Sequence, residues 1–182
     1  MNNYIALLRG INVGGHNKLP MKELATVLEK LGLADVKTYI QSGNVVFRSE
    51  RTDIATLSEE ITAAIGQSHG FSPQIFILRK EQLQAAIEAN PYPEASEEPK
   101  TLHFFFLDAT PQQFDQDALE AIKKENERFQ LVDNVFYLHA PDGIARSKVA
   151  ETATKGWDVS VTARNWRTVS KVMEMALANS QN

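Results

Sequence analysis

The sequence predicts an α+β protein made of two tandem small α/β units. Short apolar runs alternate along the chain with segments in which apolar residues recur at helical spacing. The order of these elements is similar in the two halves, although the sequences themselves do not repeat. Between the halves lies NPYPEASEEPK, which is rich in proline and glutamate and is typical of a linker. We therefore expect one unit over residues 1–80, a helix and linker over 81–100, and a second unit over 101–182.

The first unit is expected to open with a strand and a helix joined by a long polar loop. The apolar run Tyr4–Arg9 predicts a buried strand. The helix that follows has Pro20 at its first position, where the fixed φ of proline is favourable. Gly32 stands just beyond the last apolar residue of this helix and is expected to end it.

The rest of the first unit is predicted as a hairpin, a second helix and a fourth strand. Two β-rich runs flank Ser42-Gly43-Asn44, which is a hairpin signal. Asp53 is a suitable cap for the second helix, and Pro73–Arg79 has the composition of a strand. The resulting order βαββαβ predicts a ferredoxin-like unit.

The second unit is predicted to be similar but incomplete, with the order βαββαα. After a short helix over Lys80–Asn90 and the linker, TLHFFFL has the composition of a strand. Thr110–Gln113 has the pattern of a capping box and predicts the start of a helix. A second hairpin is expected at Asp133-Asn134. Two further helices are expected over Arg146–Lys155 and Ala163–Asn179.

The composition excludes several classes of chemistry. The chain of 182 residues has no cysteine, so disulfides, thiolate nucleophiles and cysteine-based zinc sites are ruled out. Its four histidines lack a metal-binding spacing, and we predict no metal site and identify no cofactor. The apolar run near the N-terminus is too short for a secretory signal or a membrane span. We expect a cytoplasmic protein without a membrane partner, and its oligomeric state stays open.

Charge is distributed unevenly along the chain. Residues 81–127 carry eleven acidic and three basic residues, whereas residues 144–171 carry six basic and two acidic ones. Such asymmetry bears on partners rather than on fold, and it is also compatible with two differently charged solvated faces.

The loop between the first strand and the first helix, RGINVGGHNKLPM, resembles a phosphate-binding loop only in part. Gly10 and Gly15 match the glycines of the P-loop pattern, but His16 and Asn17 stand where that pattern needs Lys and Ser or Thr. The loop is therefore not a P-loop. Its length of about ten residues exceeds the usual two to six, and a long loop at a helix N-terminus favours anion binding.

Other polar segments are expected beside this loop. In a split βαβ unit the first two strands are parallel, so the SGN turn and the connection at Ser68-His69-Gly70 should lie at the same end. In the second unit, VTARNWRTVSKV places Arg164 and Arg167 at a predicted helix start capped by Thr162. The candidate ligand-binding residues are Arg9, Gly10, Asn12, Gly14, Gly15, Asn17, Lys18, Ser42, Gly43, Asn44, Ser147, Lys148, Arg164, Asn165 and Arg167.

The function these residues favour is binding of an anionic ligand, either a phosphorylated small molecule or a nucleic acid, in a pocket formed by residues 10–19, 42–44 and 162–168. One alternative is a phosphate-ester hydrolase or transferase that uses His16 or His69 as a base. Another is a protein-interaction adaptor without catalysis, which would use the acidic middle of the chain. Whether the protein is an enzyme stays open, and no catalytic residue is identified.

Four segments also resemble a known family. YIALLRGINVGGHNKLPMKEL, TYIQSGNVVF, RSKV and TARNWRTV are similar to the signature segments of the family called domain of unknown function 1697. The resemblance covers essentially the whole chain and is strongest in the first segment. It implies a bacterial-type cytoplasmic protein of two small α+β units, the first ferredoxin-like, and it implies no activity.

Overall fold

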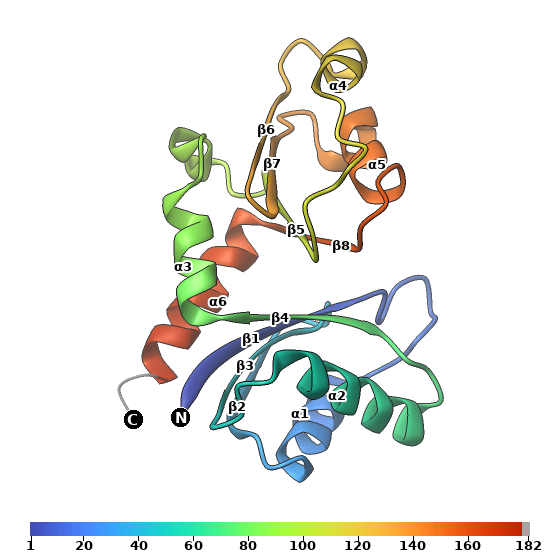
Figure 1. Ribbon diagram of the computed structural model, residues 1–182, viewed down its shortest axis with the longest axis vertical. Coiled ribbons are helices and arrows are strands. Elements are labelled where there is room, and N and C mark those ends of the chain that lie inside the picture. Colours follow the sequence, from blue (N-terminus) through green and yellow to red (C-terminus); the bar gives the residue numbers. More distant parts are fainter. Residues whose placement is uncertain (180–182) are drawn as a thin grey trace. The chain divides into compact units, whose positions relative to one another are not determined.

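The protein is a mixed α+β chain with two four-stranded antiparallel sheets and six α-helices in the described residues, 1–179 of the computed structural model (Figure 1). It divides into two compact units. Unit 1 comprises residues 1–84 and the chain from Lys171 on, and unit 2 comprises residues 85–170. The chain changes unit between residues 84 and 85 and again between residues 170 and 171, in both cases within a helix, so unit 1 is not one continuous stretch of chain.

Unit 1 contains two helices and a four-stranded sheet in the expected chain order. Its elements are β1 (Asn2–Arg9), α1 (Met21–Lys30), β2 (Ala34–Tyr39), β3 (Asn44–Ser49), α2 (Ile54–His69) and β4 (Gln74–Arg79). The strand order is β2-β3-β1-β4. Strands β1 and β2 both pair antiparallel with β3, so they run parallel to each other and end at the same edge of the sheet.

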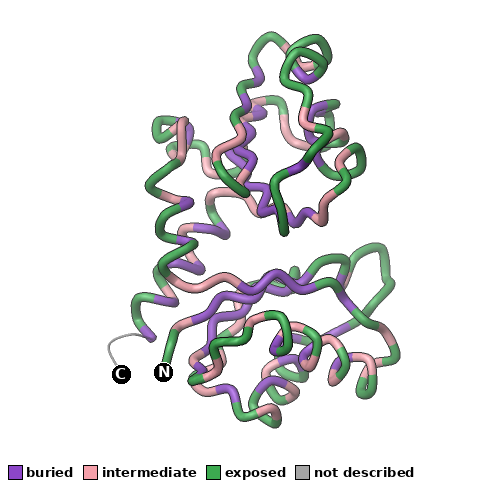
Figure 2. Tube along the Cα trace, viewed as in Figure 1, coloured by how far each residue is buried: buried purple, intermediate pink, exposed green. Residues whose placement is uncertain are grey.

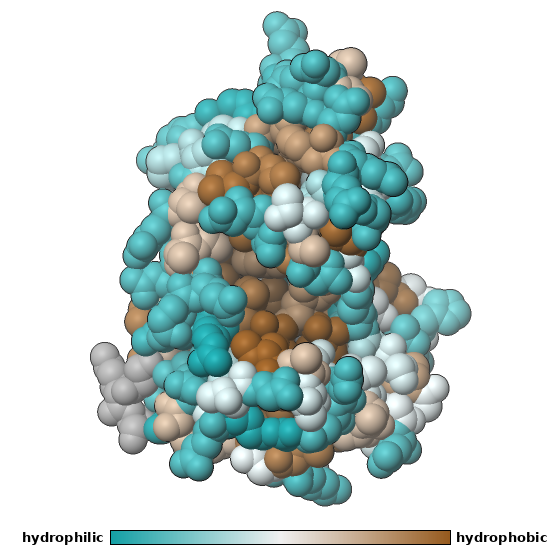
Figure 3. Space-filling view, in the orientation of Figure 1, coloured by the Kyte–Doolittle hydropathy of each residue, from teal (hydrophilic) through white to brown (hydrophobic). Residues whose placement is uncertain are grey.

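The core of unit 1 lies between one face of this sheet and the inner faces of α1 and α2. Figure 2 shows buried residues along the strands, and exposed residues along the outer sides of both helices. Figure 3 shows mainly hydrophilic or intermediate residues on the visible outer surface of these helices. Alternate strand residues and helix residues at helical spacing fill the core, among them Tyr4, Ala6, Leu8, Leu24, Leu28, Val45, Phe47, Leu57, Ile61 and Ile65.

Local signals mark the C-terminus of α1 and the N-terminus of α2, as the sequence predicts. At the end of α1, Gly32 has φ +81°, and the N–H groups of Gly32 and Leu33 donate to the carbonyls of Glu29 and Leu28 in a Schellman arrangement. The Asp53 side chain caps α2 by accepting from the Thr56 N–H. The expected position of Pro20 is off by one residue, because Pro20 is the N-cap of α1 rather than its first helical residue.

Unit 2 contains the second sheet and two complete α-helices, and a helix at each of its ends crosses into unit 1. After α3 (Lys80–Glu88), which spans the unit boundary, come the 3₁₀ turn Pro93–Glu97, β5 (Leu102–Leu107), α4 (Gln116–Ile122), β6 (Arg128–Val132), β7 (Val135–His139), the 3₁₀ turn Ile144–Arg146, α5 (Lys148–Lys155), β8 (Val161–Asn165) and α6 (Trp166–Asn179). The strand order is β6-β7-β5-β8, with every neighbouring pair antiparallel. The residues predicted as a linker are thus partly a 3₁₀ turn.

The predicted order βαββαα for this unit is wrong, because residues 161–165 form strand β8 rather than the start of a helix. Thr162 lies in this strand opposite Phe106, and it does not cap α6. The cap is Asn165, whose Oδ1 accepts from the Thr168 N–H at 3.1 Å. The strand was missed because the helix follows it directly, without a glycine or proline between them.

The predicted capping box at Thr110–Gln113 is also wrong. Helix α4 begins at Gln116, and Asp115 caps it by accepting from the Ala118 N–H at 3.0 Å. The Thr110 hydroxyl instead donates to Asn134 Oδ1 in the β6–β7 turn at 2.9 Å. The hydroxyl that a capping box requires is therefore bonded to a side chain 24 residues further along the chain, a contact that the local sequence pattern does not reveal.

Gly43 is the position in unit 1 where the backbone tolerates no side chain. Its φ is +76°, and a Cβ there would lie 2.7 Å from Leu8 Cβ and 2.8 Å from Ile11 Cδ1. Leu8 also donates its N–H to the Gly43 carbonyl at 2.8 Å. The β2–β3 turn is therefore packed tightly against the end of β1.

We expect Gly43→Ala to lower the free energy of unfolding by roughly 2–4 kcal/mol, because it adds both backbone strain and steric overlap. Gly15→Ala is the matched control, since Gly15 also has positive φ but a Cβ there meets no atom within 4 Å. The control should lose only about 1 kcal/mol. Equal losses in urea denaturation would contradict the packing argument.

A second prediction concerns pH and the histidines of unit 2. His103 is buried, and burial lowers its pKa below the ordinary 6.5. Burial, followed by the Arg128 guanidinium, also lowers the pKa of His139. Just below pH 6.5 the unfolded chain therefore binds more protons than the folded protein, so stability should fall as the pH falls through this range.

The variant His103→Asn should reduce this pH dependence, because the asparagine amide can still donate to the Thr101 carbonyl that His103 Nδ1 faces but does not titrate. Urea denaturation of both proteins from pH 7.5 to pH 5 measures the effect. Parallel stability curves for wild type and variant would show that His103 does not contribute.

Candidate functional site

The loop between β1 and α1 has a defined shape that depends on two asparagines. Asn12 and Asn17 have φ of +53° and +49°, and the Asn12 N–H donates to the Asn17 carbonyl at 3.1 Å. The Asn17 side chain donates to the Gly10 carbonyl at 2.9 Å. Asparagine tolerates positive φ better than most residues because its short amide can bond locally. Residues 12–17 therefore close into a small hairpin.

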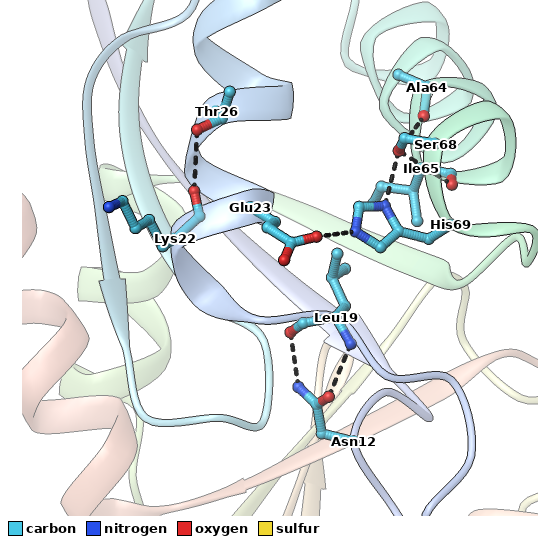
Figure 4. A network of polar contacts seen from close by, with 9 residues as sticks. All are labelled: Asn12, Leu19, Lys22, Glu23, Thr26, Ala64, Ile65, Ser68 and His69. Carbon is cyan, nitrogen blue, oxygen red and sulfur yellow. Dashed lines mark hydrogen bonds and ion pairs between the residues drawn. The ribbon is translucent and has the colours of Figure 1, made fainter.

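The side chain of Asn12 connects three segments of unit 1, and Figure 4 shows its contacts with Leu19. Its Oδ1 accepts from the Leu19 N–H at 2.8 Å, and its Nδ2 donates to the Leu19 carbonyl at 2.9 Å. The same Nδ2 donates to the Gln41 carbonyl at 2.7 Å. Asn12 thus fixes both ends of the hairpin and holds it beside the β2–β3 turn, as the predicted topology requires.

The tip of the hairpin consists of Val13-Gly14-Gly15-His16. The His16 N–H donates to the Val13 carbonyl at 3.0 Å, and both glycines have positive φ, as a type I′ turn requires. All four residues are exposed. Within the described chain the N–H groups of Gly14 and Gly15 have no hydrogen-bond acceptor, so they face solvent.

The β2–β3 turn contains a strained aliphatic residue. Ile40 has φ +47°, which is rare for a β-branched residue. Asn44 is fully buried, and its Nδ2 donates to the Tyr39 carbonyl at 3.1 Å and to Ser42 Oγ at 3.0 Å. Asn44 is the first residue of β3, so the turn is shifted by one residue from the expected Ser42–Asn44.

A third connection, between α2 and β4, meets the start of α1. His69 Nε2 lies 2.8 Å from Glu23 Oε2, and His69 Nδ1 lies 2.7 Å from Ser68 Oγ (Figure 4). Ser68 Oγ also lies 2.8 Å from the Ala64 carbonyl. The contact between His69 and Glu23 links the C-terminus of α2 to the first turn of α1.

These three connections form one end of unit 1, which we call the basic end and define as residues 9–22, 40–43 and 70–73. Strand β4 reaches it too, since Arg9 pairs with Gln74. The basic end contains no Asp or Glu, although the whole chain has 23 acidic residues and a net charge of −4. Its charged residues are the exposed Arg9, Lys18 and Lys22. The carboxylate of Glu23, just beyond it, is bonded to His69.

The structure assigns structural contacts to several of the predicted site residues in unit 1. The amides of Asn12, Asn17 and Asn44 bond to the backbone, and Gly43 is buried. The exposed candidates are Arg9, Gly10, Gly14, Gly15, Lys18 and Ser42. Ile40 is not among the residues predicted from the sequence, where its one distinguishing sign is that an aliphatic residue directly precedes the polar turn residues.

The predicted site residues of unit 2 also divide into two kinds. Ser147 is buried and caps α5 by accepting from the Ala150 N–H, and Asn165 caps α6. Arg164 lies on β8 and donates to Thr162 Oγ1 and to the Ala163 carbonyl, and burial lowers the pKa of its guanidinium to about 10. Lys148 and Arg167 are exposed.

Residues 1–179 contain neither a candidate metal centre nor a candidate membrane span. No group of three or more His, Asp or Glu side chains in this range is arranged to hold a metal ion. None of the helices there is long and apolar enough to cross a membrane.

A family model described as "Protein of unknown function (DUF1697)" matches residues 1–137. The chain belongs to this family. A solved structure of another protein, the conserved bacterial protein SP0830 from Streptococcus pneumoniae, is similar to this DUF1697 protein. The two share 26% sequence identity with a TM-score of 0.69, over 96% of this chain and 98% of the other. No curated protein matches this DUF1697 member.

The hairpin of this DUF1697 protein should lose its shape when the Asn12 side chain is removed. Asn12→Ala deletes three hydrogen bonds and leaves a β-carbon at positive φ, and we expect a loss of about 2–4 kcal/mol in unfolding free energy. Asn12→Gly deletes the same bonds without the strain, so it should lose about 1 kcal/mol less.

Amide hydrogen exchange reports on the same contact locally. In both variants exchange at the Leu19 N–H should become faster, whereas exchange in β1 should change little. Unchanged protection of Leu19 would show that Asn12 does not hold the loop.

Proposed function

We propose that the basic end of unit 1 binds a phosphate-bearing anion. The observation that carries the proposal is the charge of this end, which has three exposed cations on a chain that is acidic overall, whereas the adjacent carboxylate of Glu23 is engaged by His69. Phosphate groups are attracted by such a surface over distances up to a Debye length, about 8 Å at physiological salt.

The hairpin supplies hydrogen-bond donors for such a ligand. The N–H groups of Gly14 and Gly15 face solvent, and Lys18 lies on the same loop. Helix α1 adds its N-terminus, because Pro20 caps it without a side-chain hydrogen bond. Since Asn12 and Asn17 already fix the loop, binding would order few additional residues, and this favours affinity.

In this proposal the asparagines of the basic end have a supporting role, and contact with the ligand comes from Arg9, Gly14, Gly15, Lys18 and Ser42. Arg164, Arg167 and Lys148 of unit 2 remain candidates for contact with the same class of ligand. Substituting Arg167, in addition to the unit 1 residues, tests whether Arg167 contributes to ligand binding.

The ligand class includes phosphorylated small molecules and nucleic acid, which share the phosphate group and differ in how salt affects binding. A single-stranded nucleic acid that contacts about three cations should lose affinity with a slope near −2 in log K against log salt. A small phosphate ester, with fewer charges in contact, should depend on salt less steeply.

The alternatives expected from the sequence have less support. A hydrolase or transferase needs a histidine beside Ser42 or a substrate, and His69 contacts Ser68 and Glu23 instead. His16 is exposed at the hairpin tip. An adaptor role for the acidic residues 81–127 has no specific contact that favours it.

We also propose that unit 1 is ferredoxin-like and that the protein is bacterial and cytoplasmic. The strand order β2-β3-β1-β4 and the chain order βαββαβ support a ferredoxin-like description of unit 1. The family resemblance supports a bacterial, cytoplasmic protein.

The test is binding of pyrophosphate, ATP and a fluorescein-labelled oligodeoxythymidylate to the full chain at low salt, by calorimetry and anisotropy. We expect at least one of these probes to bind. Lys18→Ala should weaken that binding roughly fivefold to tenfold, the loss typical of one charge-assisted contact.

Lys30→Ala is the matched control, because Lys30 is an exposed lysine in the last turn of α1, at the opposite end of the helix. It should bind like the wild type. Absence of binding to all three probes, or equal losses for both variants, would reject the proposal.

A further inference from the structure

Two exposed aliphatic side chains lie at the basic end. Val13 is 66% exposed and Ile40 is 50% exposed, and they are two of the five large hydrophobic residues exposed in the described chain. Val13 follows Asn12 and Ile40 precedes Gln41, and Asn12 Nδ2 donates to the Gln41 carbonyl, so the two residues belong to loops that meet at this end. The basic end therefore combines cations with an apolar pair.

Ile40 is also conformationally unfavourable where it stands. Its φ of +47° suits glycine or asparagine, and such a conformation destabilises the fold by roughly 1–2 kcal/mol when the residue is β-branched. An exposed isoleucine gains little from burial in the folded monomer that could offset this strain. Strained residues of this kind gather at functional sites, so a contact outside the monomer accounts for the side chain.

The chemistry of the pair favours one occupant over the others. Nucleic acid bases stack on aromatic side chains, and neither Val13 nor Ile40 is aromatic. A stable protein interface buries about 800 Å² on each partner, more than two aliphatic side chains provide. A phospholipid surface needs no matching shape, since separate aliphatic side chains enter the acyl layer while neighbouring cations meet the phosphates.

We propose that the basic end docks on the surface of an anionic phospholipid bilayer, with Val13 and Ile40 entering the acyl layer and Arg9, Lys18 and Lys22 contacting lipid phosphates. This inference rests on the proposed function, and it identifies the bound phosphate group as that of a lipid headgroup. It reverses the expectation of no membrane partner, which depended only on the absence of an apolar run long enough to span a bilayer. Peripheral docking requires no such run.

The test uses co-sedimentation of the full chain with vesicles of phosphatidylcholine alone and with vesicles that also contain phosphatidylglycerol. The wild type should bind only the second kind, and added salt should weaken the binding. The double variant Val13→Ser/Ile40→Asn should bind these vesicles at least roughly tenfold more weakly, because burial of each aliphatic side chain corresponds to about tenfold in affinity.

Three controls separate the parts of the inference. Leu177→Gln removes an aliphatic side chain that is 47% exposed on α6, and it should bind vesicles like the wild type. The double variant should still bind pyrophosphate, because it retains every cation of the basic end. Ile40→Gly alone should raise the melting temperature by relieving the strain, and it should also weaken vesicle binding.

The pyrophosphate, vesicle and oligonucleotide binding results together distinguish failure of the lipid inference from failure of the proposed function. Pyrophosphate binding without vesicle binding would overturn the lipid inference and leave the proposed function standing. Absence of both would overturn both. Vesicle binding that the double variant retains would overturn the role of the apolar pair. Binding of the labelled oligonucleotide without vesicle binding would assign the basic end to nucleic acid instead.

Discussion

The side chain of Asn12 is the contact on which the basic end depends. One amide group closes the hairpin on Leu19 and joins it to the β2–β3 turn through Gln41. Asparagine suits this position for two reasons, because its amide both donates and accepts, and because it tolerates positive φ. Without this contact, the hairpin would keep only its internal bonds and would no longer be held to Leu19 and to the β2–β3 turn.

Because hydrogen bonds fix the loop, the charged groups on it have fixed positions. On a flexible loop, Lys18 would be one of many solvated lysines, whereas a fixed loop presents it together with the N–H groups of Gly14 and Gly15. Arg9, Lys18 and Lys22 outnumber the one adjacent carboxylate, Glu23, which is bonded to His69, so this surface is cationic although the chain carries a net charge of −4. Fixed geometry and charge together distinguish the basic end from an ordinary glycine-rich turn.

Much of this arrangement follows from the sequence because its signals are local. Asp53 and Gly32 mark helix ends through their own backbone and side-chain chemistry, and the structure confirms both. The meeting of the first loop with the β2–β3 turn follows from strand order alone, and the Asn12–Gln41 bond confirms it. The family assignment is confirmed over residues 1–137.

What the sequence could not predict depends on partners far along the chain. Strand β8 exists because residues 161–165 pair with β5, more than fifty residues away, and that pairing overrides the helical pattern that continues into α6. Asn12 and Asn44 were expected to contact a ligand, because a polar residue in a loop carries no sign that its amide bonds to the backbone. The strain at Ile40 is likewise a property of φ, which residue type alone does not reveal.

The central claim is that the rigid hairpin of the basic end receives a phosphate group. An amide NMR titration of the full chain with pyrophosphate tests it most directly, because glycine amides are well resolved and report on their own N–H groups. The account predicts saturable shifts centred on Gly14, Gly15 and Lys18, with smaller ones in the β2–β3 turn. Saturable shifts confined to residues outside the basic end, or no saturable shifts at all, would contradict it.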